Sequence, residues 1–149
     1  MLKAISRYAF MILASLAFLG LGSTTNYDAA YAASTQVIEN VENEALPAGA
    51  TIEQVETAVL SALTGRGWTL SARAPGSVDA QYARRGFTVT IRVTYTAQTY
   101  SIAYVESSGL NYDPETQRIH GNYNRWVRNL QVDIPRLVQN AVLGAPPPQ

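Results

Sequence analysis

The side chains that could do chemistry gather in one polar stretch, residues 107–126. It contains His120, the single histidine, which could act as a general base because imidazole titrates near neutral pH. A base needs a nucleophile within hydrogen-bonding reach, and Ser107, Ser108 and Asp113 are near it in sequence. The strand-to-helix motif G-x-S-x-G, which presents a nucleophilic serine, is absent from the chain. We therefore favour a packing or helix-capping role for His120, with a small hydrolase that uses His120 as the alternative.

Acidic residues of the same stretch are candidates for metal binding or acid–base chemistry. Asp113 and Glu115 resemble a fragment of a calcium loop, but such loops need about five protein oxygens, a defining glycine and a distal bidentate acid. A structural turn is the favoured interpretation. Glu106 and Asp113 are the one nearby pair for glycoside chemistry, which requires two converging carboxylates. The chain has no cysteine and one histidine, so we expect no catalytic residue, no metal and no cofactor.

Amides and aromatic rings in this stretch favour binding instead. Tyr112, His120, Asn122 and Tyr123 form the expected contact surface, because aromatic rings and amides together hold a sugar ring or an extended peptide. Asn122 is also a suitable N-cap for a helix. The alternative interpretation is a capped helix whose aromatic residues, Tyr123 and Trp126, close one edge of a sheet.

The elements that must position these residues are predicted to be a helix, four strands and a second helix. Thr51 is the expected N-cap of the first helix, since Gln54 completes a capping box, and Gly65 and Gly67 end it. The apolar residues of this helix recur at three- and four-residue steps. They are Ile52, Val55, Val59, Leu60 and Leu63.

Alternating apolar and polar residues predict four strands joined by short turns, which form an antiparallel meander. The alternation covers residues 68–73, 78–82, 87–95 and 100–105. One face of this sheet is apolar, and the other carries Thr, Ser and Arg and is expected to face water. On the polar face, Arg73 and Arg92 would form an anion site if the strand register brings them together.

The second helix is predicted from an apolar stripe that begins at Trp126. Leu130, Ile134, Leu137 and Ala141 continue this stripe. Pro135 lacks a backbone N–H, so we expect a kink or a break near residue 133. With both helices on the apolar face, the expected fold class is α+β, a two-layer sandwich in the order α-β-β-β-β-α.

The N-terminal segment has the features of a secretory signal peptide. Lys3 and Arg7 precede a short apolar stretch at 8–22, which is shorter than the roughly 20 residues needed to span a bilayer. Cleavage after Ala32 is expected to leave a periplasmic or secreted protein without a transmembrane span. The expected organisation is a signal peptide (1–32), a flexible N-terminal arm (33–50), an α+β domain (51–143) and a Pro-rich tail (144–149).

The run 119–130 (IHGNYNRWVRNL) resembles a motif of small exported or lipid-anchored bacterial envelope proteins of unassigned function. The earlier pieces Gly67-Trp68, 100–104 (YSIAY) and 107–112 (SSGLNY) match in the same order, so the resemblance covers residues 52–138. It implies a periplasmic setting and supplies neither a reaction nor a ligand. Ser23 stands where lipidated members have their cysteine, so we do not expect a lipid anchor.

The charge of the chain argues against one class of partner, nucleic acids. The 149 residues are 15% charged with a formal net charge of zero, which argues against binding nucleic acid through bulk positive charge. We expect an exported, non-catalytic binding or interaction module of the cell envelope, whose partner is an envelope protein or a glycan. A structural or inhibitory module that pairs through a sheet edge is a further alternative.

Overall fold

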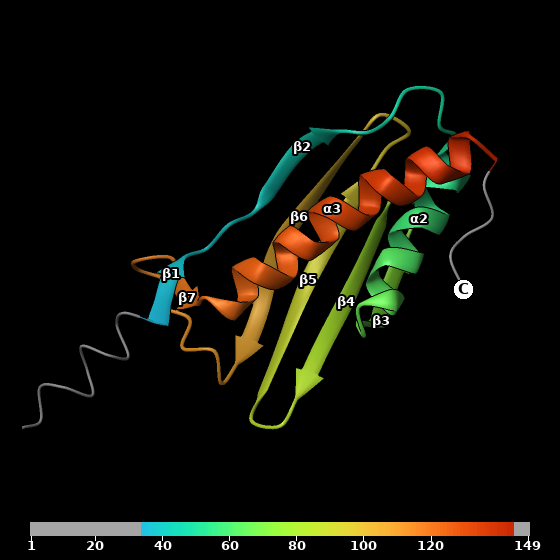
Figure 1. Cartoon of the computed structure of the whole chain (residues 1–149). Helices are drawn as coiled ribbons and strands as arrows, with labels where there is room; N and C mark the ends of the chain where they lie inside the picture. Colours follow the sequence, from blue (N-terminus) through green and yellow to red (C-terminus); the bar gives the residue numbers. More distant parts are fainter. Residues whose placement is uncertain (1–33, 145–149) are drawn as a thin grey trace, which may run out of the picture.

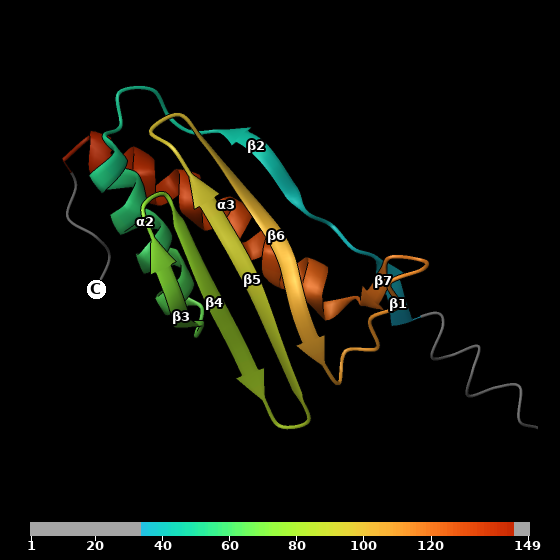
Figure 2. The same ribbon diagram turned by 180° about the vertical axis from the view of Figure 1, so that it is seen from behind.

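A computed structural model of the chain describes residues 34–144 and has an α+β architecture with two helices and a five-stranded antiparallel sheet (Figure 1). Both helices cover the same face of the sheet, and the opposite face is open (Figure 2). The predicted signal peptide and the tail from residue 145 lie outside the described residues. In chain order the elements are β1 (Thr35–Val37), β2 (Val41–Ala45), α2 (Ile52–Gly65), β3 (Thr69–Ala74), β4 (Ser77–Arg84), β5 (Phe87–Tyr95), β6 (Thr99–Ser108), β7 (Arg118–His120) and α3 (Asn122–Val142).

The four predicted strands form the meander β3 to β6, as expected, in a sheet of order β2-β6-β5-β4-β3. In β5, Val89, Ile91 and Val93 are buried against the helices, whereas Arg92 and Thr94 are exposed on the open face. The predicted apolar face of the sheet is therefore confirmed. The capping box at the start of α2 is confirmed too, with hydrogen bonds in both directions between Thr51 and Gln54.

The main sheet has five strands instead of four because β2, from the segment expected to be a flexible arm, joins its edge; β1, from the same segment, lies in another sheet. β2 pairs with β6 at the sheet edge, and β1 pairs with β7 in a separate two-stranded sheet. The side chain of Asn124, which is 0% exposed, connects this segment to α3. Its Oδ1 accepts the backbone N–H of Glu39 at 3.0 Å, and its Nδ2 donates to the carbonyl of Val37 at 2.8 Å. These hydrogen bonds, with the buried side chains of Val41 and Leu46, hold the segment in place.

Helix α3 continues through Pro135, so of the kink or break predicted near residue 133, the break is wrong. A proline at 135 leaves the carbonyl of Gln131 without its usual helical N–H donor. The hydroxyl of Tyr100, on β6, donates to that carbonyl at 3.3 Å. A side chain from the sheet thus compensates for the missing helical hydrogen bond. Asp133, two residues before Pro135, forms ion pairs with Arg66 and Arg136.

The loop after β6 packs directly on the turn between β4 and β5. Gly109 has a φ of +74°, and a Cβ atom at this position would lie 2.1 Å from the carbonyl oxygen of Gly86. Only glycine fits there, because the contact is with backbone that has little freedom to move. This contact fixes where the polar stretch leaves the sheet.

Candidate functional site

His120 caps the start of α3. Its Nδ1 accepts a hydrogen bond from the backbone N–H of Asn122 at 3.2 Å, one of the amides that a helix leaves without an internal partner. The expected N-cap, Asn122, is instead the first helical residue, and Gly121 is the N-cap and makes no side-chain capping bond. The favoured capping role of His120 thus agrees with the geometry.

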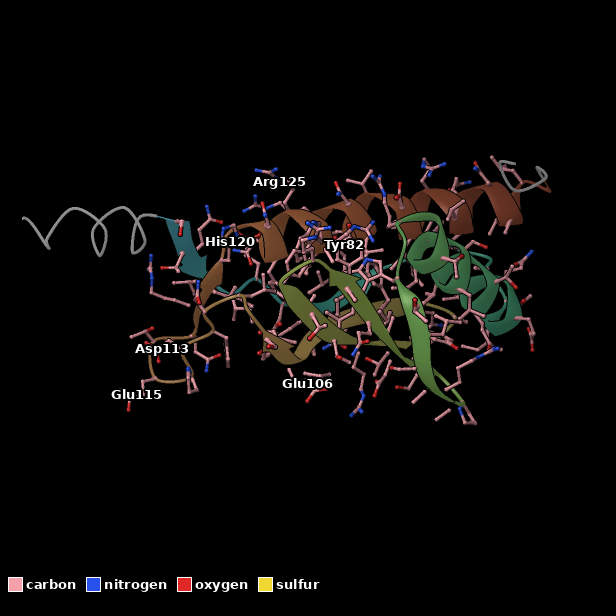
Figure 3. The ribbon with its side chains drawn as sticks, turned by 90° about the horizontal axis from the view of Figure 1, so that it is seen from below. Tyr82, Glu106, Asp113, Glu115, His120 and Arg125 are labelled. Atoms are coloured by element: carbon pink, nitrogen blue, oxygen red, sulfur yellow. The ribbon has the colours of Figure 1, made fainter. Side chains whose placement is uncertain are left out.

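Two of the three groups that could have worked with His120, Ser107 and Asp113, are engaged elsewhere. The hydroxyl of Ser107 is hydrogen-bonded to that of Tyr104 at 2.9 Å. Asp113 accepts the backbone N–H of Glu115 at 2.9 Å and the hydroxyl of Thr116 at 2.6 Å, which makes it part of a tight turn. These hydrogen bonds lower the pKa of the Asp113 carboxyl group. In Figure 3, Asp113 and Glu115 lie in a loop at one end of the molecule, apart from Glu106 and from His120.

Two of the four residues expected to form the contact surface are packed against other tyrosines. Tyr123 is 0% exposed, and within residues 34–144 its buried hydroxyl has no hydrogen-bond partner. Tyr112 is half-buried, with its ring centroid 4.3 Å from that of Tyr104. His120 and Asn122 stay half-exposed at the start of α3. The fold therefore removes Tyr123 from the expected contact surface and leaves only part of the Tyr112 ring exposed.

The anion site expected from Arg73 and Arg92 is not formed. Arg92 makes a two-point ion pair with Asp79 on the neighbouring strand, through contacts of 2.7 Å each. Arg73 is paired with Glu56 of α2. Each guanidinium group is thus paired with its own carboxylate, and Asp79 also lines the shallow depression that the two arginines share, so this depression has no excess of positive charge.

A different set of residues forms a charged hollow between the C-terminal end of α2, the C-terminal half of β4 and the first turns of α3. We call it the arginine–tryptophan hollow. Its volume is about 250 Å³. Its lining residues are Arg66, Trp68, Tyr82, Arg125, Trp126 and Asn129.

Local structure explains how this hollow is built. Arg66 ends α2 as its C-cap, and Gly67, with a φ of +81°, turns the chain so that Trp68 enters the core just before β3. The ring centroid of Tyr82 lies 5.3 Å from that of Trp68 and 5.0 Å from that of Trp126. In Figure 3, Tyr82 lies beneath α3, whereas Arg125 extends outward from the helix. The rings of Trp68, Tyr82 and Trp126 are thus packed together, while Arg66 and Arg125 are exposed.

The electrostatics of the hollow favour an anion, because its lining holds two arginines and no carboxylate. Within residues 34–144, the structure gives Arg125 no ion pair. Arg66 donates its Nε to Asp133 at 2.6 Å, and this carboxylate raises the pKa of Arg66 further. A third guanidinium, that of Arg84, lies 4.5 Å from the ring centroid of Tyr82. The hollow is positive in a chain whose net charge is zero.

A second depression adjoins this hollow at Arg66. We call it the helix groove, because it lies between α2 and α3, and its volume is about 330 Å³. Its charged residues are Arg66, Asp133 and Arg136. Its other lining residues are Ser61, Ala62, Gly65 and Leu137. Arg66 therefore belongs to both depressions.

The sequence pattern placed Trp68 at the start of a predicted strand and Trp126 at the start of an apolar helical stripe or at a sheet edge. It did not connect the arginines with either tryptophan. The lining comes from three separate segments, 66–68, 82 and 125–129. One available signal was the spacing of Asn122, Arg125, Trp126 and Asn129, which share one helical face at steps of three and four residues.

Comparisons with protein-family models, with curated proteins and with solved structures found no match. In the described part, residues 34–144, none of the helices is both long enough and apolar enough to cross a membrane. Over the same residues, no three His, Asp or Glu side chains gather in a way that could hold a metal ion. The function is therefore inferred from the contacts of His120 and the lining of the arginine–tryptophan hollow.

Proposed function

We propose that this protein is an exported, non-catalytic module that binds an anionic component of the bacterial cell envelope in the arginine–tryptophan hollow. The observation that carries the proposal is the lining of that hollow, in which Arg66 and Arg125 meet aromatic rings and an amide without a carboxylate. Guanidinium groups recognise carboxylates and phosphates by two parallel hydrogen bonds. A partly enclosed site strengthens such bonds relative to bulk water.

Export is supported by the N-terminal segment, in which two basic residues precede a short apolar stretch. The resemblance of residues 119–130 to small envelope proteins supports the same compartment. A binding role is favoured over hydrolysis by the hydrogen bond at His120, because one ring nitrogen already caps α3. Ser107 and Asp113, its candidate partners, are bonded to other groups.

The two tryptophans make the proposal directly testable. The chain contains two Trp residues, and both line the hollow, so tryptophan emission reports on this site. The experiment titrates the protein with three purified anions: oligogalacturonate, poly-L-glutamate and poly(glycerol phosphate). We expect at least one of them to change the emission with saturation, and Arg125→Gln to weaken that binding about tenfold or more, as expected for loss of one charge-assisted contact.

Arg92→Gln is the matched control, because it removes the same charge from the open face of the sheet. It should bind like the wild-type protein. If all three anions leave the emission unchanged, the proposal is wrong. Equal weakening by both substitutions would reduce the effect to net charge and would also contradict it.

A further inference from the structure

We infer that the ligand is an acidic polysaccharide, a chain of uronic-acid sugars, which runs from the arginine–tryptophan hollow into the helix groove. This inference rests on the proposed function and specifies its ligand. It adds Arg136, which lies outside the hollow, to the binding residues. It also requires a ligand longer than one sugar.

The two depressions adjoin at Arg66, which lines both of them. Arg125 and Arg136 are eleven residues apart on the same helix, a spacing that returns a side chain to within about 20° of the same face. Their backbones are then separated by about 16 Å along the helix axis. Arg66 approaches α3 between them, where it bonds to Asp133. Three arginines, Arg125, Arg66 and Arg136, thus lie along this side of α3, and the two depressions together contain one carboxylate, that of Asp133.

These guanidinium groups keep donors for a ligand. A guanidinium has five N–H donors. Arg66 gives only its Nε to Asp133, and Arg136 gives its Nη2 to the same carboxylate at 3.1 Å. About half of each arginine side chain is exposed, at 44% for Arg66 and 50% for Arg136. The remaining Nη donors can therefore bind a second carboxylate without displacing Asp133.

The neutral groups of the hollow favour sugars over other anions. Tyr82 and Trp126 are half-buried and line the hollow, so part of each ring is open to a ligand, whereas Trp68 is buried. Aromatic faces carry partial negative charge and attract the weakly positive C–H groups of a pyranose ring. The amide of Asn129 both donates and accepts, as sugar hydroxyls require. An acidic peptide or a glycerol phosphate chain has the negative charges but lacks pyranose rings. A uronic-acid chain offers carboxylates, hydroxyls and C–H faces together.

The test compares ligands of different length and backbone by isothermal titration calorimetry on the full chain. The probes are galacturonic acid monomer, its hexamer, a neutral glucose hexamer and poly-L-glutamate. We expect the acidic hexamer to bind more tightly than the monomer and the neutral hexamer not to bind. Arg136→Gln should weaken the hexamer about tenfold and leave the monomer unchanged, since only a long ligand reaches the groove.

Arg136→Lys keeps the charge but loses the planar fork, so its hexamer affinity should lie between those of the wild-type protein and Arg136→Gln. Arg92→Gln again serves as the charge control. The inference is overturned if Arg136→Gln binds the hexamer like the wild-type protein, or if poly-L-glutamate binds as tightly as the acidic hexamer. In those cases Arg125-dependent binding of another anion would preserve the proposed function. Binding of no anion at all would refute both.

Discussion

The passage of α3 through Pro135 makes a specific prediction about two residues that are far apart in the sequence. Tyr100→Phe removes the hydroxyl that donates to the carbonyl of Gln131. Pro135→Ala supplies a backbone N–H that can bond to the same carbonyl. Either donor can therefore satisfy this carbonyl, so the cost of losing the first should depend on the presence of the second.

The magnitude follows from the contact. Tyr100 is 1% exposed, and burial raises the pKa of its phenol, so the hydroxyl stays protonated and keeps its donor. Tyr100→Phe leaves a partly buried carbonyl without a partner and should lower the free energy of unfolding by about 1 kcal/mol. In the Pro135→Ala background the same change should cost close to nothing, since the new amide provides the bond. Pro135→Ala alone should stabilise the protein by about 1–2 kcal/mol, less than the full helix-interior cost of proline.

The assay is urea unfolding of the four proteins of this double-mutant cycle, followed by circular dichroism. Tyr95→Phe is the matched control, because Tyr95 is a buried tyrosine on the same sheet face whose surroundings include Glu56 instead of α3. Its cost should be equal in both backgrounds. If Tyr100→Phe also costs the same in the wild-type and Pro135→Ala backgrounds, the hydroxyl does not compensate for the proline and the reasoning is wrong.

Three further predictions concern stability. Tyr123→Phe should raise the free energy of unfolding by up to about 1 kcal/mol, because it removes a buried hydroxyl without a partner among the described residues; urea unfolding that shows a loss would reveal a hidden partner. Asp133→Asn should lower stability by about 1 kcal/mol at neutral pH, since Arg66 and then Arg136 hold the pKa of Asp133 below its ordinary value. That contribution is present above the unfolded pKa of about 4 and is lost as the pH falls through the folded pKa, so the two proteins should converge near pH 2 in a pH series of unfolding curves. Asn124→Ala should lower the free energy of unfolding by about 2–3 kcal/mol and speed hydrogen exchange in residues 35–45 more than in β4, because its side chain holds the N-terminal segment to α3. An equal increase of exchange in both regions would contradict this role.

Local patterns predicted the elements whose partners are close in the sequence. The alternation in 87–95 placed the correct side chains in the core, and the capping box marked the start of α2. β1 and β2 could not be predicted in this way, because their order comes from distant partners. Asn124, the residue that holds them, contacts Val37 across 87 positions and looks like a surface amide in the sequence.

The candidate site was harder to predict because packing, and not composition, decides which aromatic rings are accessible. Tyr123 has the residue type of a binding surface, yet the fold buries it under Tyr104. Trp126 looked like the first residue of a core stripe, yet it is half-buried at the edge of a hollow. Arg66 lies between two glycines that only mark the end of a helix, and its place beside α3 follows from the tertiary fold.

The most direct test of the central claim is the NMR response of the two indole N–H groups during titration with the galacturonic acid hexamer. Trp68 and Trp126 supply one indole signal each, and both line the arginine–tryptophan hollow. Both signals should shift with saturation in the wild-type protein and in Arg92→Gln. In Arg125→Gln they should shift much less at the same ligand concentrations, with half-saturation at about tenfold more ligand or beyond. Shifts confined to backbone amides of residues 107–124 or of the open sheet face, with unmoved indole signals, would contradict the account.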